Sequence, residues 1–300
     1  LDSCPICASS IKRWRNKVTG DGRFQIDICS SCGYAFVNPR PSISFLMQYY
    51  SSSGHGHNQE LSTDIAINIE SLLMKEAASP NSTIDAKRMV NTVENLAPEK
   101  SQNKFLDVGC GFGFFSREAL LHGYDLTCLE MAKIERSVAS QLLGTCPINC
   151  SFEDFPSSPG KFNVVLMSQI LEHAHDVNLW IAKAHELLAD DGILTIALPN
   201  FGSIFRIVLQ ENEPYICPPA HLNFFNPVSL SRLLEKHGFK VEQVQWVSRI
   251  PSQTFAKRLP SAAKPLLPLI TIASNAALKI IDSCRLGMMI NIYARKVGTS

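Results

Sequence analysis

The feature that most constrains the fold of this chain is a glycine turn between two short apolar runs. Residues 104–108 (KFLDV) form the first run and residues 126–129 (LTCL) form the second, and each is long enough for one buried strand. The glycine turn occupies residues 109–113, and apolar side chains then recur at helical spacing over residues 114–122. This order of strand, turn, helix and strand predicts a parallel sheet with a helix packed against it.

The composition of this turn indicates a nucleoside site. Gly109, Gly111 and Gly113 remove Cβ atoms where a ligand would lie against the main chain. Glu130 ends the second strand, where an acid can accept two hydrogen bonds from a ribose diol. The third glycine follows the second too closely for a dinucleotide fingerprint, so a nicotinamide enzyme is disfavoured. Asp107, just before the turn, is unfavourable for a pyrophosphate and suits a cofactor that carries an ammonium and a sulfonium group.

Residues 107–113 (DVGCGFG) resemble the first motif of class I S-adenosylmethionine-dependent methyltransferases. The resemblance implies an α/β fold, with a Rossmann-like, doubly wound sheet of seven strands whose last strand is antiparallel. It also implies S-adenosyl-L-methionine as cofactor. The cofactor-binding residues that it implies are Asp107, Gly109, Cys110, Gly111, Gly113, Glu130, Met131, Ser151, Phe152 and Gln169.

The adenine side of the expected site departs from the family pattern. The resemblance places Met131 against the adenine and Ser151 with Phe152 at its edge. An acid usually accepts from the adenine amine at the position that Ser151 occupies here. Ser151 with the backbone and ring of Phe152 is one interpretation of this contact, and Glu153 or Asp154 is the other.

The candidate catalytic residues are Gln169, His173 and His221. Residues 169–176 (QILEHAHD) resemble the family's fourth motif, so Gln169 is expected near the sulfonium. Glu172 and His173 have two interpretations: a base for an acceptor hydroxyl, or an acid that caps a helix beside a buried histidine. His221 lies in a segment that resembles the family's lid, where it would act as the base or hold the lid by hydrogen bonds.

Four cysteines near the start of the chain predict a zinc ribbon. Cys4 and Cys7 form one C-x-x-C knuckle, and Cys29 and Cys32 form another, with the spacing of a four-cysteine zinc site. Four thiolates leave no open coordination position, so the zinc is expected to be structural. The alternative is that these are redox-active or fortuitous cysteines.

The chain divides into three expected parts. Residues 1–40 are the zinc ribbon, residues 41–98 are a helical linker with cofactor-covering helices, and residues 99–300 are the methyltransferase domain. Within that domain we expect a lid at 199–226 and an insertion at 251–284. The further expected helices are 61–78, 85–96, 134–143, 179–188 and 228–237, and the further expected strands are 24–28, 147–150, 161–168, 193–198, 239–247 and 288–295. The segment 51–57, with His55 and His57, is expected to be a hinge.

The bulk composition adds few constraints. The chain has 45% hydrophobic residues, 18% charged residues and a net charge of +1. This net charge is too small to attract the whole protein to nucleic acid or to an anionic membrane. The ten cysteines are mostly scattered, which favours reduced thiols and a cytoplasmic location. We find no secretory signal and no apolar run of the ~18 residues that a membrane span needs. A shallow membrane contact through residues 266–272 is an alternative to burial of that stretch.

These observations predict a methyltransferase that acts on a small-molecule acceptor such as a sugar, a glycan precursor or a secondary metabolite. One alternative is a ribosomal RNA methyltransferase, since a basic patch lies on the ribbon, although the near-neutral charge disfavours RNA. The patch consists of Lys12, Arg13, Arg15 and Lys17. Another alternative is a non-catalytic adaptor that keeps the fold. The acceptor atom and the oligomeric state are not predicted.

Overall fold

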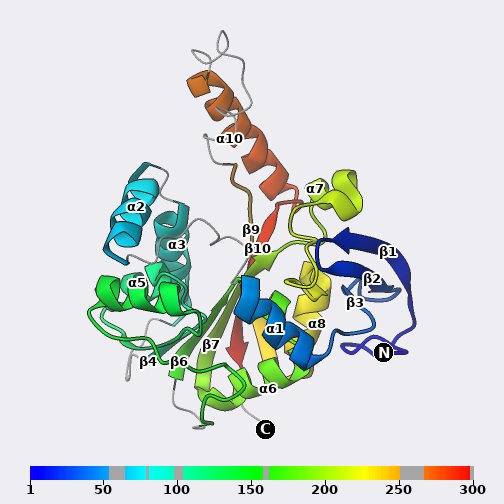
Figure 1. Cartoon of the computed structure of the whole chain (residues 1–300), viewed down its shortest axis with the longest axis horizontal. Helices are drawn as coiled ribbons and strands as arrows, with labels where there is room; N and C mark the ends of the chain where they lie inside the picture. The colour runs from blue at the N-terminus through cyan, green and yellow to red at the C-terminus, as the bar shows by residue number, and fades with distance from the viewer. Residues whose placement is uncertain (54–64, 79–80, 98–103, 158–161, 251–266, 298–300) are drawn as a thin grey trace.

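The computed structural model describes residues 1–53, 65–78, 81–97, 104–157, 162–250 and 267–297. These residues form two sheets, a larger one of six strands and a smaller one of four (Figure 1). The predicted hinge histidines, His55 and His57, lie outside the described residues, as does residue range 251–266 of the predicted insertion.

The larger sheet has the strand order β5-β4-β6-β7-β10-β9. Strands β5, β4, β6 and β7 pair in parallel, and β10 lies antiparallel between β7 and β9. The predicted antiparallel last strand is therefore confirmed. The bounds are β4 (Lys104–Val108), β5 (Asp125–Leu129), β6 (Phe162–Ser168), β7 (Leu188–Pro199), β9 (Phe239–Val247) and β10 (Met289–Lys296).

Helices cover both faces of this sheet, as the predicted doubly wound architecture requires. Figure 1 shows α2, α3 and α5 on one side and α1, α6 and α8 on the other, with α10 extending away from the sheet. The bounds are α1 (Ile43–Ser53), α2 (Ile65–Ala78), α3 (Asn81–Leu96), α4 (Phe114–Leu121), α5 (Lys133–Leu143), α6 (Val177–Leu187), α7 (Ile204–Leu209), α8 (Pro227–Lys236) and α10 (Leu267–Ser283).

Local sequence explains why these helices begin and end where they do. Asp176 accepts backbone hydrogen bonds at the start of α6, and Asn226 forms a capping box with Ser229 at the start of α8. Gly144 ends α5 in a left-handed conformation that costs glycine little. The core lies between these helices and the central strands, where Val165 and Ile196 are fully buried.

Two elements of the larger sheet differ from the prediction. The expected strand at 147–150 reduces to one parallel bridge between Ile148 and Leu129, so six strands rather than seven are formed in the described part of the chain. Pro147 lacks an N–H and Ile148 is half exposed, so neither supports a longer ladder. Strand β7 begins at Leu188, earlier than predicted, because Asp190 and Asp191 continue the strand through a register irregularity.

The smaller sheet joins the amino-terminal region to the predicted lid. Its order is β1-β2-β3-β8, all antiparallel, with bounds β1 (Ile11–Thr19), β2 (Gly22–Cys29), β3 (Ala35–Val37) and β8 (Asn223–Phe224). Strand β8 comes from the predicted lid, where Asn223 pairs with Phe36 and Phe224 pairs with Ala35. The four-cysteine segment and the residues predicted to form a lid therefore share one sheet, a link that the sequence did not predict.

Helix α10 exposes several large apolar side chains. Leu269, Ile272 and Ile280 each expose about two thirds of their surface, at 65, 67 and 64%, whereas Leu278 is buried. Among the described residues, no helix has both the length and the apolar character that crossing a membrane requires.

Candidate functional site

The glycine turn lies at the carboxyl ends of β4 and β5, the edge of a parallel sheet where ligands bind. Gly109, Gly111 and Gly113 all have positive φ angles, of 69°, 55° and 86°. A Cβ atom on Gly109 would lie 2.9 Å from Cδ1 of Ile170, and this contact together with the positive φ favours glycine there. Around Gly111 nothing lies within 4 Å of such an atom. The turn therefore presents open backbone at its centre.

Asp107 supplies a buried acid beneath the turn. Its side chain is 1% exposed and accepts a hydrogen bond of 2.7 Å from the Ser116 hydroxyl on α4. Burial raises the pKa of Asp107 to about 7, Ser116 opposes this shift, and the nearby Glu130 charge adds to it. A cation placed beside this carboxyl would stabilise its ionised form.

Glu130 is held against the turn by two backbone groups. Its Oε2 accepts from the Gly111 N–H at 2.8 Å, and its Oε1 accepts from the Ala132 N–H at 2.8 Å. The side chain is 5% exposed, so two backbone donors replace most of the water that a carboxylate needs. The carboxylate therefore lies beside the exposed backbone of Gly111, as a ribose contact requires.

Cys110, the remaining turn residue, faces the interior. It is 8% exposed and packs with Cys128 and Ala139 in a small cluster behind the turn. Its backbone N–H donates to the Leu129 carbonyl at 2.8 Å, which ties the turn to β5. Only the backbone of Cys110 is placed to meet a ligand.

The residues expected around adenine form a loose group. Met131 is 61% exposed directly after β5. The Ser151 hydroxyl donates to Oδ2 of Asp154 at 2.7 Å and accepts from the Asp154 N–H at 3.0 Å, so these two alternatives act together. The ring of Phe152 is buried edge-on against Trp180 at 5.2 Å. The Phe152 ring is thus engaged with Trp180, and its contact with adenine stays a prediction.

Gln169 takes a strained position directly after β6. It has a positive φ of 56°, it is exposed, and its N–H donates to the Ala197 carbonyl at 2.8 Å. A non-glycine residue in this conformation is uncommon and often marks a functional site. Its location at the carboxyl end of the central strand agrees with the expected place beside the cofactor.

Glu172, His173 and His221 come together next to this edge. One ligand atom of each lies within 4.8 Å of those of the other two, and the two imidazoles meet edge to face at 4.9 Å. Nδ1 of His173 lies 2.7 Å from the Ala220 carbonyl, and Nδ1 of His221 lies 2.7 Å from the Tyr215 carbonyl. A carbonyl only accepts, so each Nδ1 carries a proton and each Nε2 is directed elsewhere.

Glu172 is the unusual member of this cluster. It is 1% exposed, and within the described residues neither of its carboxylate oxygens has a hydrogen-bond partner. Burial raises the pKa of Glu172 to about 8. The expected role as a helix cap is not seen, because the 3₁₀ turn Leu171–His173 has no side-chain cap bond and Asp176 caps the next helix. A buried, unpartnered acid beside two imidazoles is instead typical of a site of proton transfer.

A small surface pocket opens beside His221. The lining includes two residues that sequence reasoning missed, Arg206 and Glu213. Burial raises the pKa of Glu213 to about 7, while the Arg206 guanidinium lies 4.4 Å over the Phe201 ring. No motif marks these residues, since only folding of the lid brings them to the carboxyl end of β7. The complete lining is Pro199, Asn200, Phe201, Arg206, Glu213, Tyr215, Ile216, His221, Asn223 and Phe224.

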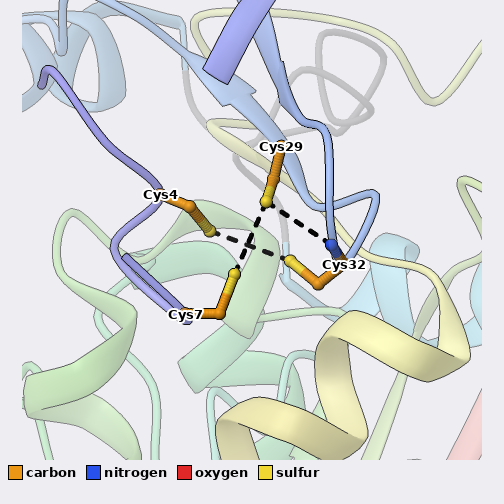
Figure 2. Close-up of side chains that lie close together, drawn as sticks. All are labelled: Cys4, Cys7, Cys29 and Cys32. Carbon is orange, nitrogen blue, oxygen red and sulfur yellow. Dashed lines mark hydrogen bonds between the residues drawn. The ribbon is translucent and has the colours of Figure 1, made fainter. Parts of the chain in front are cut away.

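The four amino-terminal cysteines converge on one point (Figure 2). Sγ of Cys4 lies 3.7 Å from Sγ of Cys32, and Sγ of Cys7 lies 3.5 Å from Sγ of Cys29. A tetrahedral zinc with bonds of about 2.3 Å requires sulfur–sulfur separations of about 3.8 Å, so this donor set fits zinc. The N–H groups of Ser31 and Cys32 both donate to Sγ of Cys29 at 3.4 Å, which fixes this sulfur within the second knuckle.

Comparison with known proteins places the chain among methyltransferases. The family model described as methyltransferase domain matches residues 83–244, more than half of the chain. The ubiquinone biosynthesis O-methyltransferase of Glaesserella parasuis serovar 5 is 28% identical over 157 residues, covering 47% of this chain and 66% of that protein. The mitochondrial ubiquinone biosynthesis O-methyltransferase of Rattus norvegicus is 26% identical over 173 residues, covering 52% and 50%. The chain thus spans between half and two thirds of the length of these curated relatives.

A solved structure with the same fold covers most of the chain. The 1,6-didemethyltoxoflavin-N1-methyltransferase of Burkholderia thailandensis, with bound 1,6-didemethyltoxoflavin and S-adenosylhomocysteine, aligns with a TM-score of 0.50 and 17% identity. The alignment covers 90% of this chain and 98% of that one. At this identity the likeness shows the fold alone.

Proposed function

The chain belongs to the methyltransferase domain family, and we propose that it transfers the methyl group of S-adenosyl-L-methionine to a small-molecule acceptor. The observation that carries this proposal is the arrangement around Gly111, where open backbone lies between the buried acids Asp107 and Glu130. We also propose that the chain divides into three parts, a zinc ribbon, a helical linker and a methyltransferase domain with a lid.

The residues at the glycine turn fit the parts of S-adenosyl-L-methionine. Asp107 would stabilise the ammonium end, because its carboxyl is buried and lacks a cationic partner among the described salt bridges. Glu130 would exchange its backbone donors for the ribose hydroxyls. Met131, with Ser151 and Asp154, would flank the adenine. When bound, this cofactor supplies an electrophilic methyl group on a sulfonium.

We propose that the acceptor presents a hydroxyl group at the surface pocket beside His221. Both curated relatives are named O-methyltransferases, and a hydroxyl must lose its proton as its oxygen attacks the methyl carbon. In this step the oxygen–carbon bond forms, the sulfur–carbon bond breaks, and the proton passes to Nε2 of His221. The Tyr215 carbonyl fixes the tautomer that can accept it. His173 and Glu172 would stabilise the resulting imidazolium, while Gln169 helps to align the acceptor.

The ribbon argues for a small molecule rather than RNA. Arg13 pairs with Asp27 at 2.7 Å, and Arg15 pairs with Glu211 at 3.3 Å. Lys17 donates to the Glu211 carbonyl at 2.5 Å. Three of the four residues of the predicted basic patch are therefore engaged within the protein and are less available for phosphates.

We propose further that the four cysteines hold a structural zinc ion. The support is the fit of their sulfur separations to a tetrahedral site and the absence of an open ligand position. Total reflection X-ray fluorescence of the purified protein should find one zinc per chain, and a Cys29→Ser variant should lose it.

The methyl transfer is tested with S-adenosyl-L-methionine labelled in its methyl group. Panels of catechols, sugar nucleotides and hydroxylated metabolites are screened by mass spectrometry, with a His221→Ala variant beside the wild type. We expect label in at least one class and a large loss in the variant. Binding of S-adenosylhomocysteine without transfer to any class would favour a non-catalytic adaptor.

A further inference from the structure

A single buried amide connects the three segments that meet at the acceptor side. Asn223 is 2% exposed and begins β8, the strand that joins the lid to the ribbon. Its side chain is within hydrogen-bond distance of five groups from three parts of the chain. Such a fully engaged buried amide fixes its partners in one arrangement, because a lost bond leaves a buried polar group unpaired.

The nitrogen of this amide binds the turn that carries Glu172 and His173. Nδ2 lies within hydrogen-bond distance of the carbonyls of Leu171 at 3.2 Å, Glu172 at 3.2 Å and Ala174 at 2.7 Å, so its two N–H groups serve three acceptors and one of them is shared. A turn of three residues leaves carbonyls unsatisfied at its end, and Asn223 satisfies them from outside. The Leu222 N–H adds a bond of 2.8 Å to the Glu172 carbonyl.

The oxygen of the amide binds two residues near the end of the ribbon. Oδ1 accepts from the Tyr34 hydroxyl and from Nη2 of Arg40, the latter at 2.6 Å. Nη1 of Arg40 also donates to the Leu222 carbonyl at 2.9 Å. Arginine can only donate and a carbonyl can only accept, so the amide of Asn223 has one orientation that satisfies both sides.

We infer that Asn223 is a positioning residue, which sets the Glu172–His173 turn against His221. His221 lies two residues before Asn223 on the same segment, and its ring meets that of His173 at 4.9 Å. The Asn223 side chain therefore fixes the distance from His221, the proposed base, to Glu172 and His173. This inference rests on the proposed function of that cluster.

The arrangement also connects the ribbon to the proposed base. Tyr34 lies two residues after Cys32, and its buried ring packs on Phe36 at 5.2 Å and on Phe225 at 5.0 Å. Removing the Tyr34 hydroxyl leaves the three amide–carbonyl bonds and the Arg40 bond in place. Tyr34→Phe should therefore disturb the position of the Asn223 amide less than substitution of Asn223 itself.

The test compares Asn223→Ala, Asn223→Asp and Tyr34→Phe with the wild type. Asn178→Ala serves as the matched control. Asn178 also bridges the ribbon and the body, by a bond of 3.1 Å to the Pro5 carbonyl, but its other side-chain partners are Lys236 and His237 rather than the Leu171–His173 turn. The pH titrations of the His173 and His221 ring signals are followed by nuclear magnetic resonance with labelled histidine. Calorimetry with S-adenosylhomocysteine and circular dichroism check the cofactor side and the fold.

We expect both Asn223 variants to shift the two histidine titrations and to lower turnover roughly 10- to 100-fold, as a misplaced reacting group does. Tyr34→Phe should shift them less and in the same direction, and Asn178→Ala should leave them unchanged. Cofactor affinity should stay within about twofold of the wild type.

Unchanged histidine titrations in folded Asn223→Ala would overturn the inference. If neither Asn223 variant folds, unchanged titrations in Tyr34→Phe would overturn it instead. A wild type that binds no S-adenosylhomocysteine and transfers no methyl group would contradict the proposed function, while the titrations would still test the positioning role separately.

Discussion

The two halves of the site are built in different ways. The cofactor half comes from one continuous stretch, residues 104–130, whose strands pair directly as β4 and β5. The acceptor half is assembled from segments far apart in the sequence, which meet through Asn223, Arg40 and the 3₁₀ turn Leu171–His173. The first half depends on local geometry, and the second depends on tertiary contacts that include the ribbon.

This difference implies that the two halves should fail separately. A perturbation of the ribbon or of β8 should reach the acceptor half, because β3 and β8 are paired strands. It should leave the glycine turn intact, because that turn is held by its own bonds to Glu130 and Leu129. We therefore expect each perturbation to affect one half of the site and to leave the other half unchanged.

Loss of the metal centre should have the largest effect. Structural zinc sites contribute about 10 kcal/mol or more to the folding of small zinc domains. Cys29→Ser should therefore unfold the ribbon and abolish turnover, while the affinity for S-adenosylhomocysteine falls by only a few-fold, roughly 1 kcal/mol. Thermal unfolding and calorimetry on the same samples measure both. If cofactor binding were lost together with the folded ribbon, the two halves of the site would not be independent.

Removal of the proposed base should lower turnover without affecting the cofactor half. General base catalysis typically contributes about 10²- to 10⁴-fold, so His221→Ala should lose activity in that range. His237→Ala is the control, since His237 lies on the far end of α8 near Asn178. Equal turnover in the His221 variant and the wild type would remove His221 as the base.

The pH dependence of cofactor affinity should identify Asp107. Burial raises the pKa of this carboxyl from 3.8 to about 7, so the free protein holds the proton below pH 7. A bound ammonium favours the carboxylate, so binding releases a proton and affinity should rise about tenfold per pH unit up to pH 7 and then level off. Calorimetry in buffers with different ionisation enthalpies measures the number of protons released on binding. A flat profile would place the ammonium elsewhere.

The same raised pKa has a consequence for stability without ligand. The folded state binds the Asp107 proton more tightly than the unfolded state does, so the contribution is complete below pH 4 and is lost as the pH rises through 7. Asp107→Asn should therefore lose less stability than the wild type over that window, in which the raised pKa values of Glu172 and Glu213 still contribute. Denaturant titrations of both proteins at several pH values make the comparison.

The smallest effect is expected at Gln169. Its positive φ costs about 1 kcal/mol, and glycine adopts that conformation freely, so Gln169→Gly should not destabilise the fold. Turnover should fall about tenfold if the side chain aligns the acceptor. A variant with full turnover would mean that only the backbone matters there.

The sequence predicted the local structure around the glycine turn well because its information is local. Strand β4 has the bounds that were predicted, and Gly144 ends α5 as expected, since glycine and strand patterns report on neighbouring residues. The buried ring of Phe152 was not foreseen, because its contact with Trp180 crosses two elements. The predicted strand at 147–150 failed because Ile148 is the only residue there that pairs with β5 in the described structure.

The acceptor half was only partly predictable. His221 and the L-E-H run were found by resemblance, but nothing in the sequence showed that they meet. Asn223 lies in an ordinary apolar context (HLNFFN), and its role depends on the pairing of β8 with β3, which are separated by nearly 190 residues in the sequence. Long-range pairing of two-residue strands leaves no periodic signal.

The central claim is that the glycine turn with Asp107 and Glu130 binds S-adenosyl-L-methionine. Calorimetric titration of the zinc-replete protein with S-adenosylhomocysteine, with NAD as control and Asp107→Asn as variant, tests it most directly. The account predicts binding of S-adenosylhomocysteine but not NAD, weakened about 10- to 100-fold in the variant by loss of a charged hydrogen bond. A folded wild type that binds NAD, or that binds neither compound, would contradict it.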